Sequence, residues 1–165
     1  MTAKELFIMF VADETPRFER VLKAIPAGNR DYKPDPKSKT AVEIAAGIVG
    51  TSAMLGDLLT KSSYDFANYT VPSGKEPVEL ASLFVANMNA LQKTAKTVAE
   101  EDWSKDVAML MNGKEEWKAS RVMMLTSFLA DLVHHRGQLS TYLRAMGGKV
   151  PAIYGPSADS AESGA

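Results

Sequence analysis

FLADLVHHRGQLSTYLRAMGG, residues 128–148, is the stretch that decides the fold. It has the periodicity of one long helix that ends at the glycine pair 147–148. Extended back to Met124, one stripe of this helix is apolar except at Asp131 and His135. The stripe consists of Met124, Phe128, Asp131, Leu132, His135, Leu139 and Tyr142. Because Asp131 and His135 are four residues apart, we expect both to face the same way on a buried surface.

A carboxylate and an imidazole one helical turn apart permit three interpretations. They can be two ligands of a divalent metal, which then needs a third donor such as Glu43 or Asp57. They can be an acid–base dyad for water-assisted or thiol chemistry, or a hydrogen-bonded structural pair in the core. Arg136 either pairs with a carboxylate such as Glu43 or is a solvated arginine at the bundle edge, which we favour. Spacing alone leaves these alternatives open.

Helical periodicity recurs along the chain and predicts an all-α protein. Pro16 is expected to kink the first helix, and Thr40 with Glu43 forms a capping box that starts the second. Residues 102–114 have no helical pattern, although 107–111 could be a short extended piece. We predict one four-helix bundle over residues 1–157 and a disordered tail over 158–165. Its helices are expected at residues 3–25, 40–60, 77–100 and 115–146.

Size and composition exclude several classes of protein. The chain has 165 residues, a formal net charge of −1 and no cysteine, so it has neither a basic surface for nucleic acid nor a thiol nucleophile. The sequence contains no apolar run of the length that spans a membrane, and we expect its first residues to be part of the first helix and not a targeting segment. A cytoplasmic domain with no nucleic-acid or membrane partner is the expectation.

Three glycines interrupt the second predicted helix. Each glycine inside a helix is about 1 kcal/mol less favourable than alanine, so Gly47, Gly50 and Gly56 need a reason. Close helix packing is one reason, and space left for a ligand is another.

The segment HHRGQLSTYLRAMGGKVPAIYGPSAD, with DYKPDPKS and EIAAGIV before it, resembles the DinB-like family, also called DinB/YfiT-like. The resemblance implies a four-helix bundle with up-down-down-up connectivity that is usually a dimer. It also implies a divalent metal bound by three histidines, one from the second helix and two from the fourth. Some relatives are metal-dependent thiol transferases or hydrolases.

The resemblance carries over to the ligand positions only in part. His135 falls on the last ligand position, Asp131 on the first histidine of the fourth helix, and Gly47 on the histidine of the second helix. This degenerate triad implies either no metal or a weakly bound zinc, nickel, iron or manganese held by Asp131 and His135. We expect a homodimer with a small-molecule pocket formed by Gly47, Gly50, Asp131 and His135.

Two alternatives stay open beside that expectation. One is a divalent-metal-dependent thiol transferase or hydrolase that uses Asp131 and His135. The other is a non-enzymatic structural or interaction protein with a filled core.

Overall fold

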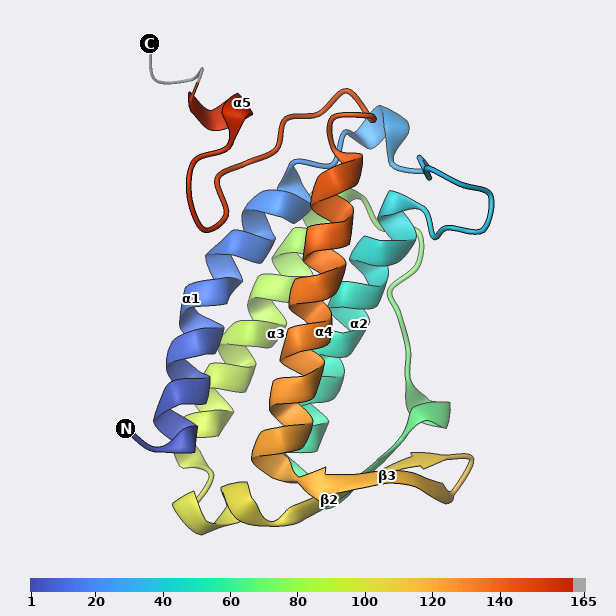
Figure 1. Ribbon diagram of the computed structural model, residues 1–165. Coiled ribbons are helices and arrows are strands. Elements are labelled where there is room, and N and C mark those ends of the chain that lie inside the picture. Colours follow the sequence, from blue (N-terminus) through green and yellow to red (C-terminus); the bar gives the residue numbers. More distant parts are fainter. Residues whose placement is uncertain (162–165) are drawn as a thin grey trace.

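Four long helices run side by side in the computed structural model, which describes residues 1–161 (Figure 1). α1 and α4 run in one direction and α2 and α3 in the other, so the helices follow one another up, down, down and up. Around the bundle, α1 and α2 each pack against both α3 and α4. The bounds are α1 Ala3–Lys23, α2 Ala41–Thr60, α3 Pro77–Thr97 and α4 Arg121–Tyr142.

A small sheet closes one end of the bundle (Figure 1). β1 (Ser63–Asp65) pairs in parallel with β2 (Asp106–Met111), and β2 pairs antiparallel with β3 (Lys114–Ser120). The two-residue turn of the β2–β3 hairpin is Asn112-Gly113, with φ angles of 52° and 79°. Both residues therefore adopt the left-handed conformation that asparagine and glycine tolerate best in such turns.

The prediction of an all-α protein is therefore correct for the bundle and wrong for its connections. α4 begins at Arg121, whereas the sequence pattern placed its start near Glu115. Residues 114–120 pair with β2 instead, because the Asn-Gly turn reverses the chain before a helix can begin. Short helical turns complete the connections: η1 Ala27–Asn29, η2 Phe66–Asn68, η3 Glu100–Ser104 and α5 Ala158–Ala161.

Pro16 lies inside α1, which continues without a break from Ala3 to Lys23. The missing amide of Pro16 would have bonded the carbonyl of Ala12, and Ala12 is exposed to solvent. The neighbouring hydroxyl of Thr15 donates to the carbonyl of Val11 at 2.6 Å. The carbonyl left without its helical partner therefore lies where water can reach it, and the helix tolerates the proline.

α2 has more buried residues than any other helix of the bundle. Its first turn has the expected capping box: the Thr40 hydroxyl accepts from the Glu43 amide at 3.2 Å, and Glu43 accepts from the Thr40 amide at 2.7 Å. By length and composition it is the one described helix that could cross a membrane, but 67% of its apolar window is buried inside the bundle. A core helix has the same composition, so this is weak evidence for a membrane span.

The chain beyond α4 folds back over the bundle. Gly147, with a φ of +82°, ends the helical turns, and the amide of Gly148 donates to the carbonyl of Leu143 at 2.8 Å. Residues 158–161, placed by the sequence in a disordered tail, form α5. The rest of that predicted tail, residues 162–165, lies outside the described residues.

Candidate functional site

A cavity of about 200 Å³ lies between α2, α4 and the connection that joins α2 to α3. α2 lines it with Glu43, Ile44, Gly47 and Thr51, and α4 with Phe128, Asp131 and His135. The walls are completed by Lys39, Phe66 and Tyr69. Three of the four residues predicted for a pocket, Gly47, Asp131 and His135, therefore lie around one cavity.

The two glycines predicted for the pocket have different surroundings. A Cβ atom at Gly47 would meet nothing within 4 Å, so the missing side chain leaves open space. At Gly50 a Cβ atom would lie 2.6 Å from the carbonyl oxygen of Thr70 and 3.0 Å from the hydroxyl of Tyr69. Gly50 thus does not line the cavity. It allows the backbone of the 69–71 segment to pass directly over α2.

Asp131 and His135 lie at the mouth of the cavity. Their side chains are 49% and 30% exposed, and Asp131 Oδ2 lies 3.5 Å from His135 Nε2. The other ring nitrogen, Nδ1, lies 3.1 Å from Gln138 Oε1. Each ring nitrogen therefore faces a side-chain oxygen.

The expectation that Asp131 and His135 are both buried is wrong, because Asp131 is exposed and His135 is only half-buried. The buried side of α4 keeps Met124, Leu132, Leu139 and Tyr142 of the predicted stripe, but it extends to Leu125, Leu129 and Arg136 in place of residues 131 and 135. Apolar residues occur on the predicted stripe and on the observed buried side, so periodicity alone could not choose between them. Arg136 lies on the buried side, and its charge is paired with Glu14 inside the bundle.

The donors present do not fit the three-histidine metal site that the family resemblance implies. Gly47 has no side chain to coordinate a metal, and no group of three potential ligands among histidine, cysteine, aspartate and glutamate occurs within residues 1–161. Glu43 lines the cavity, but its Oε2 already accepts the Thr40 amide. Asp57 pairs with Lys61 at 2.9 Å and lies ten residues beyond Gly47, about 15 Å along the helix. Neither carboxylate therefore completes a triad with Asp131 and His135.

Aromatic rings form much of the cavity wall. The Phe66 and Tyr69 rings are stacked with centroids 5.0 Å apart, and Phe128 packs against Trp117 at 6.0 Å. The Tyr69 hydroxyl donates to the carbonyl of Gly47 at 3.0 Å and lies 3.2 Å from the Thr51 hydroxyl. These contacts fix the Tyr69 ring across the side of α2.

The charges around the cavity are mostly negative. Hydrogen bonds from the Thr40 amide and hydroxyl, and the nearby charges of Lys33 and Lys39, hold the pKa of Glu43 below its usual value. Glu43 and Asp131 are carboxylates from two different helices, and Lys39 is the one lysine or arginine in the lining. The cavity is suited to a ligand that carries a positive charge between aromatic walls.

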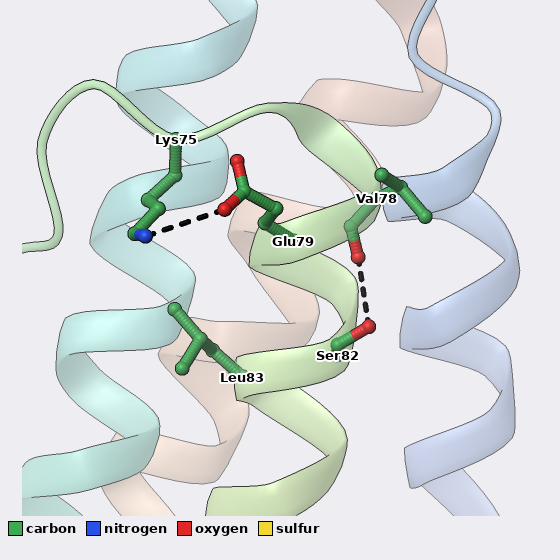
Figure 2. Close-up of a pocket in the computed structure, with 5 residues that line it drawn as sticks. All are labelled: Lys75, Val78, Glu79, Ser82 and Leu83. Carbon is green, nitrogen blue, oxygen red and sulfur yellow. Dashed lines mark hydrogen bonds and ion pairs between the residues drawn. The ribbon is translucent and has the colours of Figure 1, made fainter.

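Another hollow, of about 350 Å³, lies on the outer surface of α3 (Figure 2). Its lining comes from one short stretch, Lys75 to Leu83, with Lys75 paired to Glu79 at 3.2 Å. Figure 2 shows these side chains on the first turns of α3 and on the connection just before it, and no residue of another helix lines the hollow. A shallow surface depression of this kind holds a ligand less well than a cavity enclosed by several helices or loops.

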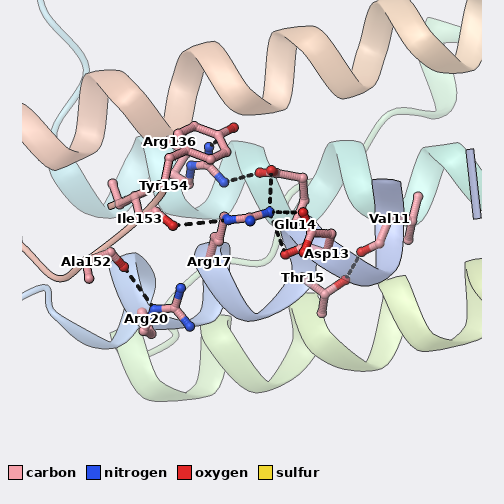
Figure 3. A network of polar contacts seen from close by, with 10 residues as sticks. All are labelled: Val11, Asp13, Glu14, Thr15, Arg17, Arg20, Arg136, Ala152, Ile153 and Tyr154. Carbon is pink, nitrogen blue, oxygen red and sulfur yellow. Dashed lines mark hydrogen bonds and ion pairs between the residues drawn. The ribbon is translucent and has the colours of Figure 1, made fainter. Parts of the chain in front are cut away.

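Sequence reasoning missed a buried polar network between α1 and α4 (Figure 3). Arg136 and Glu14 are each 2% exposed and form an ion pair, and Arg17 bonds the other oxygen of Glu14 at 2.9 Å. Arg136 also donates to the Tyr154 hydroxyl at 2.6 Å and lies over the Phe18 ring at 4.6 Å.

The favoured interpretation of Arg136 as a solvated arginine is wrong. The sequence did contain one sign of this buried network: Glu14 falls on the apolar stripe of α1 with Val11 and Phe18.

The chain belongs to the DinB family, whose profile matches residues 1–164. A DinB-like protein of Bacillus subtilis has a similar solved structure, with a TM-score of 0.72 and 16% identity over 92% of this chain and 99% of that chain. A DinB-like protein of Bacillus cereus ATCC 10987 has a TM-score of 0.70 and 18% identity, over 91% and 97% of the two chains. These likenesses establish the fold.

A more distant structure is a mutant of the mycothiol-dependent maleylpyruvate isomerase. Its TM-score is 0.57 and its identity 15%, over 91% of this chain and 65% of that chain. No curated protein matches the chain by sequence. At these identities the neighbours define the architecture, and the function must be argued from the cavity itself.

Proposed function

We propose that the protein binds a small organic cation, such as a primary amine, in the Gly47 cavity without a resident metal. The observation that carries this proposal is the position of two carboxylates, Glu43 of α2 and Asp131 of α4, around the space that Gly47 leaves open. Phe66, Tyr69 and Phe128 supply aromatic surface between them.

The charge balance of the lining supports a cationic ligand over an anionic one. The positive charge of Lys39 offsets the negative charge of one carboxylate, and it helps to lower the pKa of Glu43. The Asp131 carboxylate is 49% exposed, and the His135 ring lies 3.5 Å from it. An ammonium group beside Asp131 would gain an ion pair, and the faces of the aromatic rings would stabilise it further.

The proposal is tested by titrating the protein with ethylammonium and, separately, with acetate, followed by NMR. Ethylammonium is expected to give saturable shifts at residues around Gly47, and acetate is not. Asp131→Asn should weaken ethylammonium binding by about fivefold. Asp57→Asn is the matched control, because it removes the same charge from a residue that pairs with Lys61 away from the cavity. Equal binding of acetate, or an unchanged affinity in Asp131→Asn, would contradict the proposal.

A second candidate function is catalysis by the Asp131–His135 pair, without a resident metal. Two observations favour it: the 3.5 Å separation of the two side chains at a cavity mouth, and the isomerase among the structural neighbours. In this function Asp131 orients the His135 ring, which transfers a proton. Maleylpyruvate isomerisation assayed with mycothiol tests it. Turnover that disappears in His135→Gln, while ethylammonium still binds, would support this candidate, and a lack of turnover would remove it for that substrate.

A further inference from the structure

A second hollow adjoins the Gly47 cavity on the other side of Tyr69. It has a volume of about 460 Å³ and shares Lys39, Glu43, Gly47 and Tyr69 with the first cavity. The residues of its own are mainly apolar: Val42 and Ala46 on α2, and Val71 and Pro72 on the connection to α3. The two hollows, with four lining residues in common, adjoin each other along the surface of α2.

The wall of this second hollow is placed by a close contact at Gly50. The carbonyl oxygen of Thr70 and a methyl group of Val71 lie 2.6 and 3.0 Å from the position of a Gly50 Cβ. Together with the hydrogen bond from Tyr69 to Gly47, this contact holds the 69–72 segment against α2. Val71 therefore forms a fixed apolar wall, although 48% of its surface is exposed.

We infer that the two hollows form one site with two compartments, and that its ligand is an amphipathic amine. Its ammonium group occupies the Gly47 cavity between Glu43 and Asp131, and its apolar arm lies in the second hollow against Ala46, Val71 and Pro72. This inference rests on the proposed function, because the shared residues orient the arm only when the ammonium end is bound. Tyr69 separates the two ends of the ligand.

The inference predicts that affinity depends on the length of the alkyl arm. Titration with ethyl-, butyl- and hexylammonium should show affinity rising by up to about fourfold for each added methylene, the gain expected for burying that group. Val71→Ser should flatten this dependence of affinity on arm length, measured as the ratio of the hexylammonium to the ethylammonium affinity within the variant. Val78→Ser is the matched control, because Val78 is a valine of similar exposure, 57%, on α3.

The outcomes separate this inference from the proposed function. If ethylammonium binds but longer arms bind no more tightly, the second compartment is excluded and the Gly47 cation site stands. The second compartment is also excluded, and the Gly47 cation site stands, if affinity depends on the length of the alkyl arm as steeply in Val71→Ser as in the wild type. If none of the three ammonium ions binds, the proposed function and this inference both fail. Thermal unfolding of each variant checks that it is folded before its affinities are compared.

Discussion

At the scale of single residues, the glycines of α2 show how surroundings decide what a missing side chain does. Gly47 opens a cavity, Gly50 admits the backbone of the next connection, and a Cβ at Gly56 would meet nothing within 4 Å. All three weaken the helix by a similar amount relative to alanine. Only Gly50 is required by a close approach, so the three positions should respond differently to the same substitution.

Gly50→Ala is expected to destabilise the protein, whereas Gly56→Ala should stabilise it. The new methyl group at position 50 would lie 2.6 Å from a backbone oxygen, which forces the 69–71 segment away and costs about 1–3 kcal/mol. At position 56 the helix gains up to about 1 kcal/mol with no clash. Urea unfolding of both variants measures the difference. Equal stability of the two would show that the 69–71 segment is not held against α2.

Two features of the site could not be predicted from individual residues. The resemblance singled out Gly47, Asp131 and His135, and these lie around one cavity. Arg136, on the buried side of α4, pairs with Glu14, which is 122 positions away in the sequence. The role of Gly50 depends on the path of a connection that has no periodic pattern. Local periodicity carries no information about either long-range contact.

At the scale of elements, the β2–β3 hairpin is tied to β1 by one carboxylate. Asp65 accepts hydrogen bonds from the amides of Ala67, Asn112 and Gly113 at 2.9, 3.0 and 2.6 Å. These bonds, the one from Ala67 foremost, lower the pKa of Asp65. The sequence prediction allowed an extended piece at 107–111, which lies in β2, but it missed β3, because β3 is largely exposed and charged, with no alternation of apolar residues. Its one local signal was the Asn-Gly pair.

The lowered pKa of Asp65 predicts an acid-sensitive contribution to stability. The folded state favours the carboxylate, so this contribution is present above the ordinary aspartate pKa of about 3.9 and is lost as pH falls through the lowered value. Asp65→Asn should be less stable than the wild type at neutral pH, and the difference should shrink as the solution is acidified through this range. Unfolding curves at several pH values measure it.

The matched control for this prediction is Asp106→Asn. Asp106 is an aspartate of the same sheet whose carboxylate lies 3.8 Å from Lys118. A pH dependence that is the same in the wild type and in Asp65→Asn would show that the three amide bonds contribute nothing.

At the scale of the whole molecule, the first and last helices are joined by buried charge as well as by apolar packing. Arg17 and Arg20 donate to the carbonyls of Ile153 and Ala152, so the segment after α4 is held against α1 (Figure 3).

A homodimer stays a prediction. The exposed apolar side chains Leu6, Met9 and Phe10 of α1 and Met123 of α4 are where we would expect its interface.

Arg136→Met is expected to destabilise the protein by roughly 3 kcal/mol, because it leaves the carboxylate of Glu14 buried beside Arg17 alone. Adding Glu14→Gln should recover part of the loss, since the buried charge is then removed with its partner. Denaturant unfolding of the single and double variants measures this coupling. Arg144→Met, at an arginine that is 58% exposed and pairs with Asp159, is the control. A loss no larger than that of Arg144→Met would show that the buried pair matters little.

The pairing of Glu14 with Arg136 has a consequence for synthesis on the ribosome. The chain emerges from its N-terminus, so Glu14 and its neighbour Arg17 leave the ribosome long before Arg136, the second arginine that pairs with Glu14. Until α4 has emerged, α1 cannot bury this face with both of the partners that the Glu14 carboxylate has in the folded bundle. We therefore expect the nascent chain to keep α1 loosely associated and to complete the bundle only near the end of translation.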